Sequence, residues 1–275
     1  MYQPVVPLSG IAGWNFLQAT YDRQFESFTD SVQVKRDKDY MLAKLSEPMA
    51  VEDFLDDPRL MRVTMTAFDL GGEEWKRGFV DKVLSEVGDP ESTFLQRLNN
   101  PQYTRFAEAL SPQNGIISIS EEQRADIGSR FEAVSFKVSV GEIDNSMRLA
   151  LNYQSEISEV ATAGSSNDAI LFRLLGSVPM RNVLETALNL PSDIQKLPIE
   201  KQAEMLEARI ESQFGIRDMS ALAEPENVEK VIQRYHAINS LSSGISPLTP
   251  GAAALTILSG VGGGASQNLF LSNFL

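Results

Sequence analysis

The spacing of the apolar residues constrains the fold of this chain more than any other feature. Near the N-terminus they recur every three or four positions, at Trp14, Leu17, Tyr21, Phe25 and Phe28. This period places side chains on one face of an α-helix, so residues 13–29 are predicted to be helical. Only two short stretches have strand character, GIISIS at 115–120 and FKVSV at 136–140, and each could form a minor hairpin or part of a helix.

Local signals indicate where several helices begin and end. Ser120 followed by Gln123 has the form of a capping box and predicts a long helix through Phe136. Two further helices are expected to end at Gly164 and Gly215, because glycine readily takes the left-handed conformation that ends a helix. Prolines suited to helix starts stand at Pro58, Pro101, Pro191, Pro198 and Pro225.

These patterns predict a mainly α-helical fold, a multi-helix bundle with little or no β structure. We divide the chain into five segments on the basis of the helical periods and the charge distribution. They are an uncharged N-terminal segment with the first helix (1–29), a first helical lobe (30–112), a connecting helix (116–141), a second helical lobe (142–238) and an uncharged Gly/Ser-rich tail (239–275).

A segment of the first lobe recurs in weaker form in the second. LMRVTMTAFDLGG at 60–72 resembles MRNVLETALNLP at 180–191, and a shift of 120 residues aligns five identical residue types. The aligned pairs are Leu55 and Leu175, Val63 and Val183, Thr66 and Thr186, Ala67 and Ala187, and Leu70 and Leu190. An internal duplication that produced two related lobes accounts for this likeness, as does coincidence between two short capped helices.

Several motifs of the charged body resemble one known family. They are MRLALN at 147–152, TALNLP at 186–191, the pair Lys201-Gln202 and VIQRY at 231–235. Together they resemble the helical domain-of-unknown-function family twelve-seventeen, which occurs in alphaproteobacteria and is often encoded among flagellar genes. The resemblance implies a helical fold and a non-enzymatic part in flagellar assembly, structure or regulation. Its motifs are packing patterns, so it carries over no site residues.

The charge of the chain disfavours some partners. Its 24 Lys and Arg against 37 Asp and Glu give a net charge of -13, and all of them lie between Asp22 and Arg234. Such a chain repels nucleic acid and anionic membranes. No apolar run is long enough for membrane insertion, and Pro4 and Pro7 interrupt the N-terminal one, so no conventional signal peptide is expected. We expect a cytoplasmic or flagellum-associated protein, with the compartment otherwise open.

The reactive side chains are few. The sequence contains no cysteine and a single histidine, His236, which excludes thiolate chemistry and any metal site that needs two histidines. We expect His236 to lie near the end of the last helix, where a partial positive charge interacts favourably with the helix C-terminus. No cofactor and no metal are predicted.

Three other features have a structural explanation. GVGGGA at 260–265 matches the form G-x-G-x-x-A, but no acidic residue follows at the distance that a dinucleotide site needs, so it is interpreted as a linker.

The tryptophans Trp14 and Trp75 fit the apolar faces of their helices. Met61 and Met65 are one turn apart, as in a helix core, and packing is the predicted role of all four residues.

Carboxylates are the abundant chemical resource of this chain. The acids considered as catalytic candidates are Glu121, Glu122, Asp126, Asp56 and Asp57. A hydrolase or lyase that uses carboxylates alone and acts on peptidoglycan is therefore one alternative function. In a chain of this charge, however, acidic groups more often form solvated helix faces or favour helix N-termini.

The uncharged tail is the main sequence indication of a binding function. It ends in NLFLSNFL, and its apolar residues Leu269, Phe270, Leu271, Phe274 and Leu275 are predicted to dock, either on the chain's own core or on another protein. The sequence thus predicts a non-enzymatic structural, assembly or regulatory protein of the bacterial flagellum that acts by protein–protein binding, with self-association through the tail as one form of it. A cytoplasmic export chaperone is the other alternative.

Overall fold

A computed structural model describes residues 2–87, 89, 92–98, 100–162 and 166–242. This part of the chain contains thirteen α-helices, two short 3-10 helices and a two-stranded sheet, which confirms the predicted mainly α-helical fold. The elements up to residue 117 are α1 (Gly10–Thr29), α2 (Val32–Lys44), β1 (Met49–Ala50), α3 (Val51–Leu55), α4 (Pro58–Thr66), α5 (Arg77–Glu86), α6 (Phe94–Leu98), α7 (Pro101–Leu110) and β2 (Ile116–Ile117). The remainder are α8 (Glu121–Ile143), α9 (Asn145–Thr162), α10 (Asn167–Gly176), α11 (Val178–Ala187), η1 (Ser192–Lys196), α12 (Ile199–Phe214), η2 (Met219–Ala223) and α13 (Pro225–Ser242).

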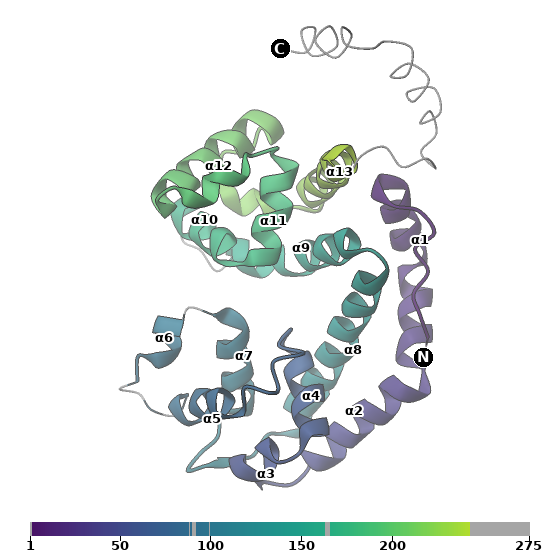
Figure 1. Ribbon diagram of the computed structural model, residues 1–275, viewed down its shortest axis with the longest axis vertical. Coiled ribbons are helices and arrows are strands. Elements are labelled where there is room, and N and C mark those ends of the chain that lie inside the picture. The colour runs from purple at the N-terminus through teal and green to yellow at the C-terminus, as the bar shows by residue number, and fades with distance from the viewer. Residues whose placement is uncertain (1, 88, 90–91, 99, 163–165, 243–275) are drawn as a thin grey trace, which may run out of the picture.

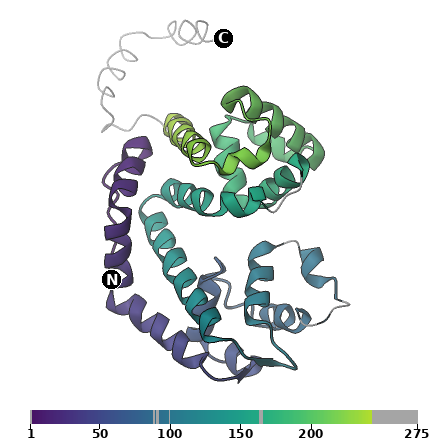
Figure 2. The same ribbon diagram turned by 180° about the vertical axis from the view of Figure 1, so that it is seen from behind.

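The helices form two lobes at opposite ends of a spine made of α1 and α8 (Figure 1). The first lobe consists of α2–α7 with the small sheet, and the second lobe consists of α9–α13. The view from behind shows the same arrangement, with α6 and α7 of the first lobe facing α9 and α10 of the second (Figure 2). Helices α2 and α4 pack on α8, while α9 packs on α8 and α13 packs on α1. Both lobes therefore depend on the spine for their relative position.

Aromatic packing joins the two helices of the spine. The ring of Phe136 in α8 meets Tyr21, Phe25 and Phe28 of α1 with centroid distances of 5.3, 5.5 and 5.5 Å and interplanar angles of 87°, 85° and 68°. Edge-to-face contacts of this kind stabilise a pair of rings by about 0.5–1.5 kcal/mol beyond the burial of their surface. The aromatic residues that recur every three or four positions in the first helix thus form its contact with α8.

The small sheet ties the first lobe to the start of α8. Strand β1 pairs with β2 in antiparallel register, Met49 opposite Ile117 and Ala50 opposite Ile116. Of the two stretches with strand character, only part of GIISIS is a strand, whereas FKVSV lies inside α8. The buried side chains of Phe136 and Val140 explain the second outcome, because four positions separate them and both face the core of a helical spine.

The predicted helix boundaries are confirmed in most cases. The capping box is formed, with Ser120 accepting from the Gln123 backbone and the Gln123 side chain accepting from the Ser120 backbone. Helix α12 ends at Gly215, whose φ is 72°. Three of the five prolines occupy the first position of a helix, and Pro191 and Pro198 directly precede η1 and α12. The predicted end at Gly164 lies outside the described residues.

The two similar segments end in the same way. After α4, Asp69 has a φ of 59° and Leu70 N donates to Met65 O at 3.0 Å. After α11, Asn189 has a φ of 50° and Leu190 N donates to Glu185 O at 2.9 Å. Both are Schellman-type endings with one left-handed residue. Since this ending is common among unrelated helices, the duplication stays a prediction.

The two tryptophans have different environments. Trp14, Met61 and Met65 are buried as predicted. The prediction for Trp75 is wrong, because its side chain is 78% exposed and lies in the turn before α5, where the helical period of α4 has already ended. Lys76 Nζ lies 5.5 Å from the centre of the Trp75 ring, a cation–π contact at the surface.

The prediction for His236 is also wrong. His236 lies in the middle of α13, and its side chain is fully buried. Its ring packs against Trp14 at a centroid distance of 5.6 Å and against Tyr235 at 5.1 Å. Neither ring nitrogen has a hydrogen-bond partner among the described residues. Burial lowers the pKa of His236 to about 4 against the opposing attraction of Asp144, so the imidazole is neutral at pH 7.

The uncharged N-terminal segment lies along α1. The side-chain amide of Gln24 accepts from Val5 N at 2.6 Å and donates to Val5 O at 3.1 Å, so it satisfies the backbone of one extended residue. The chain then reverses at Gly10, whose φ of +66° favours glycine. A Cβ at Gly10 would lie only 2.6 Å from Ser240 Oγ, so glycine also allows α1 and α13 to approach closely.

We expect Asn189→Val to destabilise the protein by about 1–2 kcal/mol, because a β-branched residue tolerates the left-handed conformation poorly. Asn182→Val is the matched control, since Asn182 is exposed within α11 and the two residue types have similar helix propensities. Urea denaturation measures both changes. Equal effects of the two substitutions would contradict the assigned helix ending.

His236 is expected to make the folded state sensitive to acid. Its folded pKa of about 4 lies below the ordinary value of 6.5, so the unfolded chain binds more protons between these pH values. The stabilisation by the neutral imidazole is complete above pH 6.5 and is lost as the pH falls toward 4. The loss amounts to roughly 3 kcal/mol.

His236→Phe tests this pH dependence, because it keeps a buried ring and removes the only imidazole of the chain. Urea denaturation at several pH values between 4 and 7 should show that the variant loses less stability on acidification than the parent protein. Carboxylates titrate in both proteins, so the difference between the curves isolates His236. Parallel curves would show that the imidazole is already hydrated in the folded protein.

Candidate functional site

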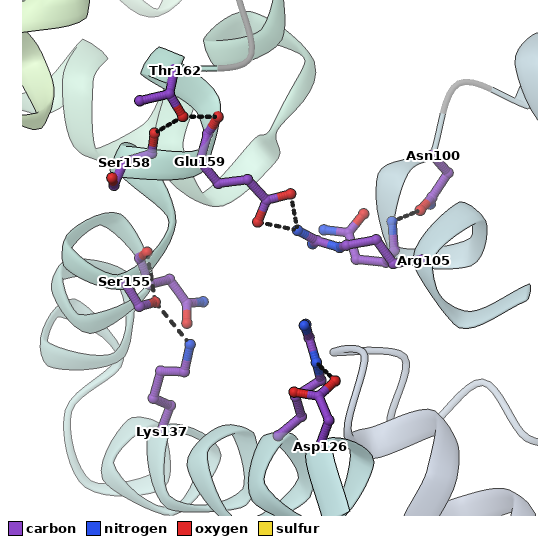
Figure 3. Close-up of polar contacts among 11 residues, drawn as sticks. Asn100, Arg105, Asp126, Lys137, Ser155, Ser158, Glu159 and Thr162 are labelled. Carbon is purple, nitrogen blue, oxygen red and sulfur yellow. Dashed lines mark hydrogen bonds and ion pairs between the residues drawn. The ribbon is translucent and has the colours of Figure 1, made fainter. Parts of the chain in front are cut away.

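Charged side chains from both lobes meet beside the spine and form the candidate site. Figure 3 shows part of this group, with side chains from α7, α8 and α9 pointing toward one another. We name it the interlobe junction and define it by Asp69, Arg105, Lys137, Arg148, Glu156 and Glu159. It draws on the end of α4, on α7 in the first lobe, on α8 and on α9, so its geometry depends on how the lobes are placed.

Two ion pairs cross the interlobe junction. Arg105 of α7 donates from Nη1 to both carboxylate oxygens of Glu159 in α9, at 3.3 and 3.2 Å (Figure 3). Arg148 of α9 donates from Nη2 to Asp69 Oδ1 at 2.9 Å. The Glu159 side chain is 64% exposed, so the first pair contributes little to stability.

Glycine at one position makes room for Arg148. A Cβ on Gly141 of α8 would lie 2.6 Å from Cδ of Arg148. Absence of that atom lets the arginine stem cross α8 directly and reach Asp69 in the first lobe. The neighbouring Arg130 guanidinium lies 6.0 Å from the centre of the Phe68 ring and is paired with Asp126 at 2.7 Å, so a further cation borders the junction.

Lys137 is the cation of the junction that forms no ion pair with a described residue. Its Nζ donates to Ser155 Oγ at 3.0 Å (Figure 3), and no described residue places a carboxylate within ion-pair distance of it. Burial lowers the pKa of Lys137. Glu156 and Asp69 oppose this effect by attraction, and Arg148 and Arg105 add to it by repulsion.

Glu156 has the complementary property. Burial raises the pKa of its carboxyl group, the attraction of Lys137 and Arg105 opposes this rise, and Asp69 and Glu159 reinforce it. Lys137 and Glu156 therefore attract each other without forming a direct ion pair. Part of the desolvation cost of both groups is therefore not offset by an ion pair, which is common for charged groups at binding surfaces.

The acids considered from the sequence have mainly structural contacts in the fold. Asp57 caps α4 by accepting from Leu60 N at 2.9 Å and also accepts from the Tyr40 hydroxyl at 2.6 Å. Asp56 pairs with Arg77. The remaining candidates are in the first two turns of α8, where Glu121 and Glu122 are exposed and Asp126 pairs with Arg130. Of these acids, only Asp126 borders the interlobe junction.

The predicted docking residues Leu269, Phe270, Leu271, Phe274 and Leu275 lie outside the described residues, as does the glycine cluster at 260–265. Within the described ranges, no three His, Asp or Glu side chains gather in an arrangement that could hold a metal ion. No helix in the same ranges is both long and apolar enough to span a bilayer.

The second lobe also has a surface cavity of about 440 Å³ between α11 and α13. Its polar lining groups are bonded mainly to each other. Arg181 Nε donates to Glu185 Oε1 at 2.6 Å, and Gln195 Nε2 donates to Glu185 Oε2 at 2.9 Å. The charged groups of this cavity are therefore already paired.

Sequence reasoning did not find the interlobe junction. Its residues are spread from position 69 to position 159, so only the tertiary structure brings them together. Two local signals were present. Lys137 is a single cation within the apolar run FKVSV, and Ser155, Glu156 and Glu159 have the spacing of one polar face of a helix. Neither signal indicates which residues of other helices these side chains contact.

The chain is similar in structure to protein AGR_C_984 of Agrobacterium tumefaciens, solved by X-ray crystallography, with a TM-score of 0.67 and 20% sequence identity over 88% of this chain and 100% of that one. At this identity the likeness shows the fold alone. No curated protein matches the sequence. The model of the family described as Protein of unknown function (DUF1217) matches residues 67–228, which is more than half of the chain. The chain is therefore a member of the DUF1217 family.

Proposed function

We propose that this protein is a non-enzymatic binding component connected with the bacterial flagellum. In this proposal it acts by protein–protein contact, and the interlobe junction is one contact site. The partner presents an acidic group to Lys137 and lies between the facing helices of the two lobes. The observation that carries this proposal is the half-buried Lys137 ammonium without a carboxylate partner among the described residues.

Electrostatics supports binding at this place. A charge that has lost part of its hydration without gaining an ion pair raises the free energy of the unbound protein. An acidic group from a partner would remove that cost, and the exposed pair of Arg105 and Glu159 could rearrange to accommodate it. The position between two lobes favours a partner segment that touches both of them.

The flagellar part of the proposal rests on the gene context implied by the family resemblance. An assembly, structural or regulatory role fits a protein most of whose large apolar side chains are buried in its core. The tail contributes a second contact in this proposal. Residues 269–275 would hook onto a groove of the partner through their apolar side chains, with the glycine-rich stretch before them as a tether.

We expect Lys137→Met to weaken capture of the partner at least about tenfold, because the variant removes the cation that the partner's acid would meet. The free energy of unfolding should change by less than about 1 kcal/mol, since Met keeps the packing of the aliphatic stem and removes a partly desolvated charge. Tagged protein from motile cells, analysed by quantitative mass spectrometry, measures capture, and urea denaturation measures stability.

Lys35→Met is the matched control, because Lys35 is a surface residue of α2 with 57% side-chain exposure and only an exposed pair with Asp30. Flagellar proteins should be recovered with the parent chain and with this control and be depleted with Lys137→Met. Recovery of the same flagellar proteins with Lys137→Met would exclude the junction as the contact site. Absence of flagellar proteins from every sample would contradict the flagellar role.

Removal of residues 243–275 should leave the body folded and reduce partner capture. The truncation begins after Ser242, because residues 239–242 belong to α13 and Ser240 packs against Gly10. Thermal melting followed by circular dichroism should be unchanged within a few degrees, since α1 and α13 remain complete. Undiminished capture of the same proteins by the shortened chain would show that the tail is not a partner contact.

A further inference from the structure

We infer that the protein self-associates through one uncharged end of its helical body, and that the partner at this surface is a second copy of the chain. The inference rests on the proposed function in taking protein–protein contact as the protein's mode of action, and it adds a surface distinct from the interlobe junction. We name this surface the uncharged end and define it as residues 8–11 with the last turn of α13, residues 237–241.

The two segments of the uncharged end lie together. Both ribbon views show the start of α1 beside the end of α13 (Figures 1 and 2). The contact is close, because a Cβ on Gly10 would lie 2.6 Å from Ser240 Oγ. The Ser240 hydroxyl donates to His236 O at 2.7 Å, which fixes the side chain that Gly10 meets.

Large aliphatic side chains are exposed at this end. Leu8 is 53% exposed, Ile11 is 40% exposed and Leu241 is 75% exposed. They are neighbours in sequence of the Gly10 and Ser240 contact, so they belong to one small region. Single exposed aliphatic residues are common on protein surfaces, but several at the same end of a body, together with a lack of charge, indicate an interaction surface.

The distribution of charge favours a second copy as the partner at this surface. The chain carries a net charge of -13, and every Asp, Glu, Lys and Arg lies between Asp22 and Arg234. Two copies therefore repel each other over most approaches and least where α1 begins and α13 ends. The charge of Asp144 acts on Tyr235 and His236, about one turn before Ser240.

An isologous contact suits this arrangement. When a surface lacks charge, a two-fold axis can place it against its own copy without bringing like charges together. Apolar side chains from both copies then leave water, which favours association in proportion to the buried area. Charged partners of other kinds would gain nothing from this end, because it offers them no ion pair.

Sedimentation velocity over a range of protein concentrations tests the inference with the full chain. We expect a reversible dimer of the parent protein. Leu241→Glu and Ile11→Glu should each raise the dimer Kd at least about tenfold, because they place like charges in the interface. Val32→Glu is the matched control, since Val32 is 65% exposed at the start of α2 in the first lobe and should leave the dimer unchanged.

Two further measurements make the assignment to this surface specific. Added salt should strengthen the dimer, because it screens repulsion between the acidic bodies. The chain shortened after residue 242 should still dimerise, since residues 8–11 and 237–241 remain in it. The inference is overturned by a parent protein that is monomeric at all concentrations, by a dimer insensitive to both Glu substitutions, by a dimer that salt weakens, or by a dimer that requires residues 243–275.

Failure of this inference and failure of the proposed function give different results. Lys137→Met changes the interlobe junction and leaves the uncharged end intact, so it should reduce partner capture without changing the dimer Kd. Leu241→Glu, in contrast, should raise the dimer Kd. Loss of dimerisation in Lys137→Met would show that copies associate through the junction instead and would overturn the inference.

Discussion

The packing of Phe136 against Tyr21, Phe25 and Phe28 is the interaction on which the rest of the structure depends. It joins α1 to α8, and these two helices are the support on which both lobes rest. The first lobe packs on α8 through α2 and α4, whereas the second reaches the spine through α9 and α13. A loose contact between α1 and α8 would therefore change the relative position of the lobes and, with it, the geometry of every group between them.

The spine also explains why the interlobe junction is polar. Helices α7 and α9 belong to different lobes, and they approach each other beyond the region that α8 covers with apolar side chains. Groups there are partly hydrated, so paired charges such as Arg105 with Glu159 are tolerated at little cost. Lys137 projects from α8 itself and is half-buried. Burial lowers the pKa of its ammonium group, an effect that a fully exposed lysine would not experience.

Features with a local cause could be predicted from the sequence. The capping box at Ser120 and the proline starts of α4, α7 and α13 depend on a few adjacent residues, and the structure contains them as expected. Environments that depend on tertiary contacts could not be predicted. His236 follows Tyr235 near the chain's last charged residue and looked like a surface group, yet Trp14, more than two hundred positions earlier, covers it. The site is a product of such contacts, since Asp69 and Arg148 become neighbours only when both lobes are in place.

Asp69 links the end of a helix to the angle between the lobes. Its backbone takes the left-handed conformation that ends the turn after α4, and its carboxylate meets Arg148, whose stem crosses α8 over Gly141. Glycine at position 69 would suit the backbone but would leave the guanidinium without its acid, and asparagine would suit the backbone without the charge. Asn189 illustrates the simpler case, because it ends α11 with a neutral amide. Asp69 thus couples the chain reversal after α4 to the orientation of the two lobes, so that neither can change without affecting the other.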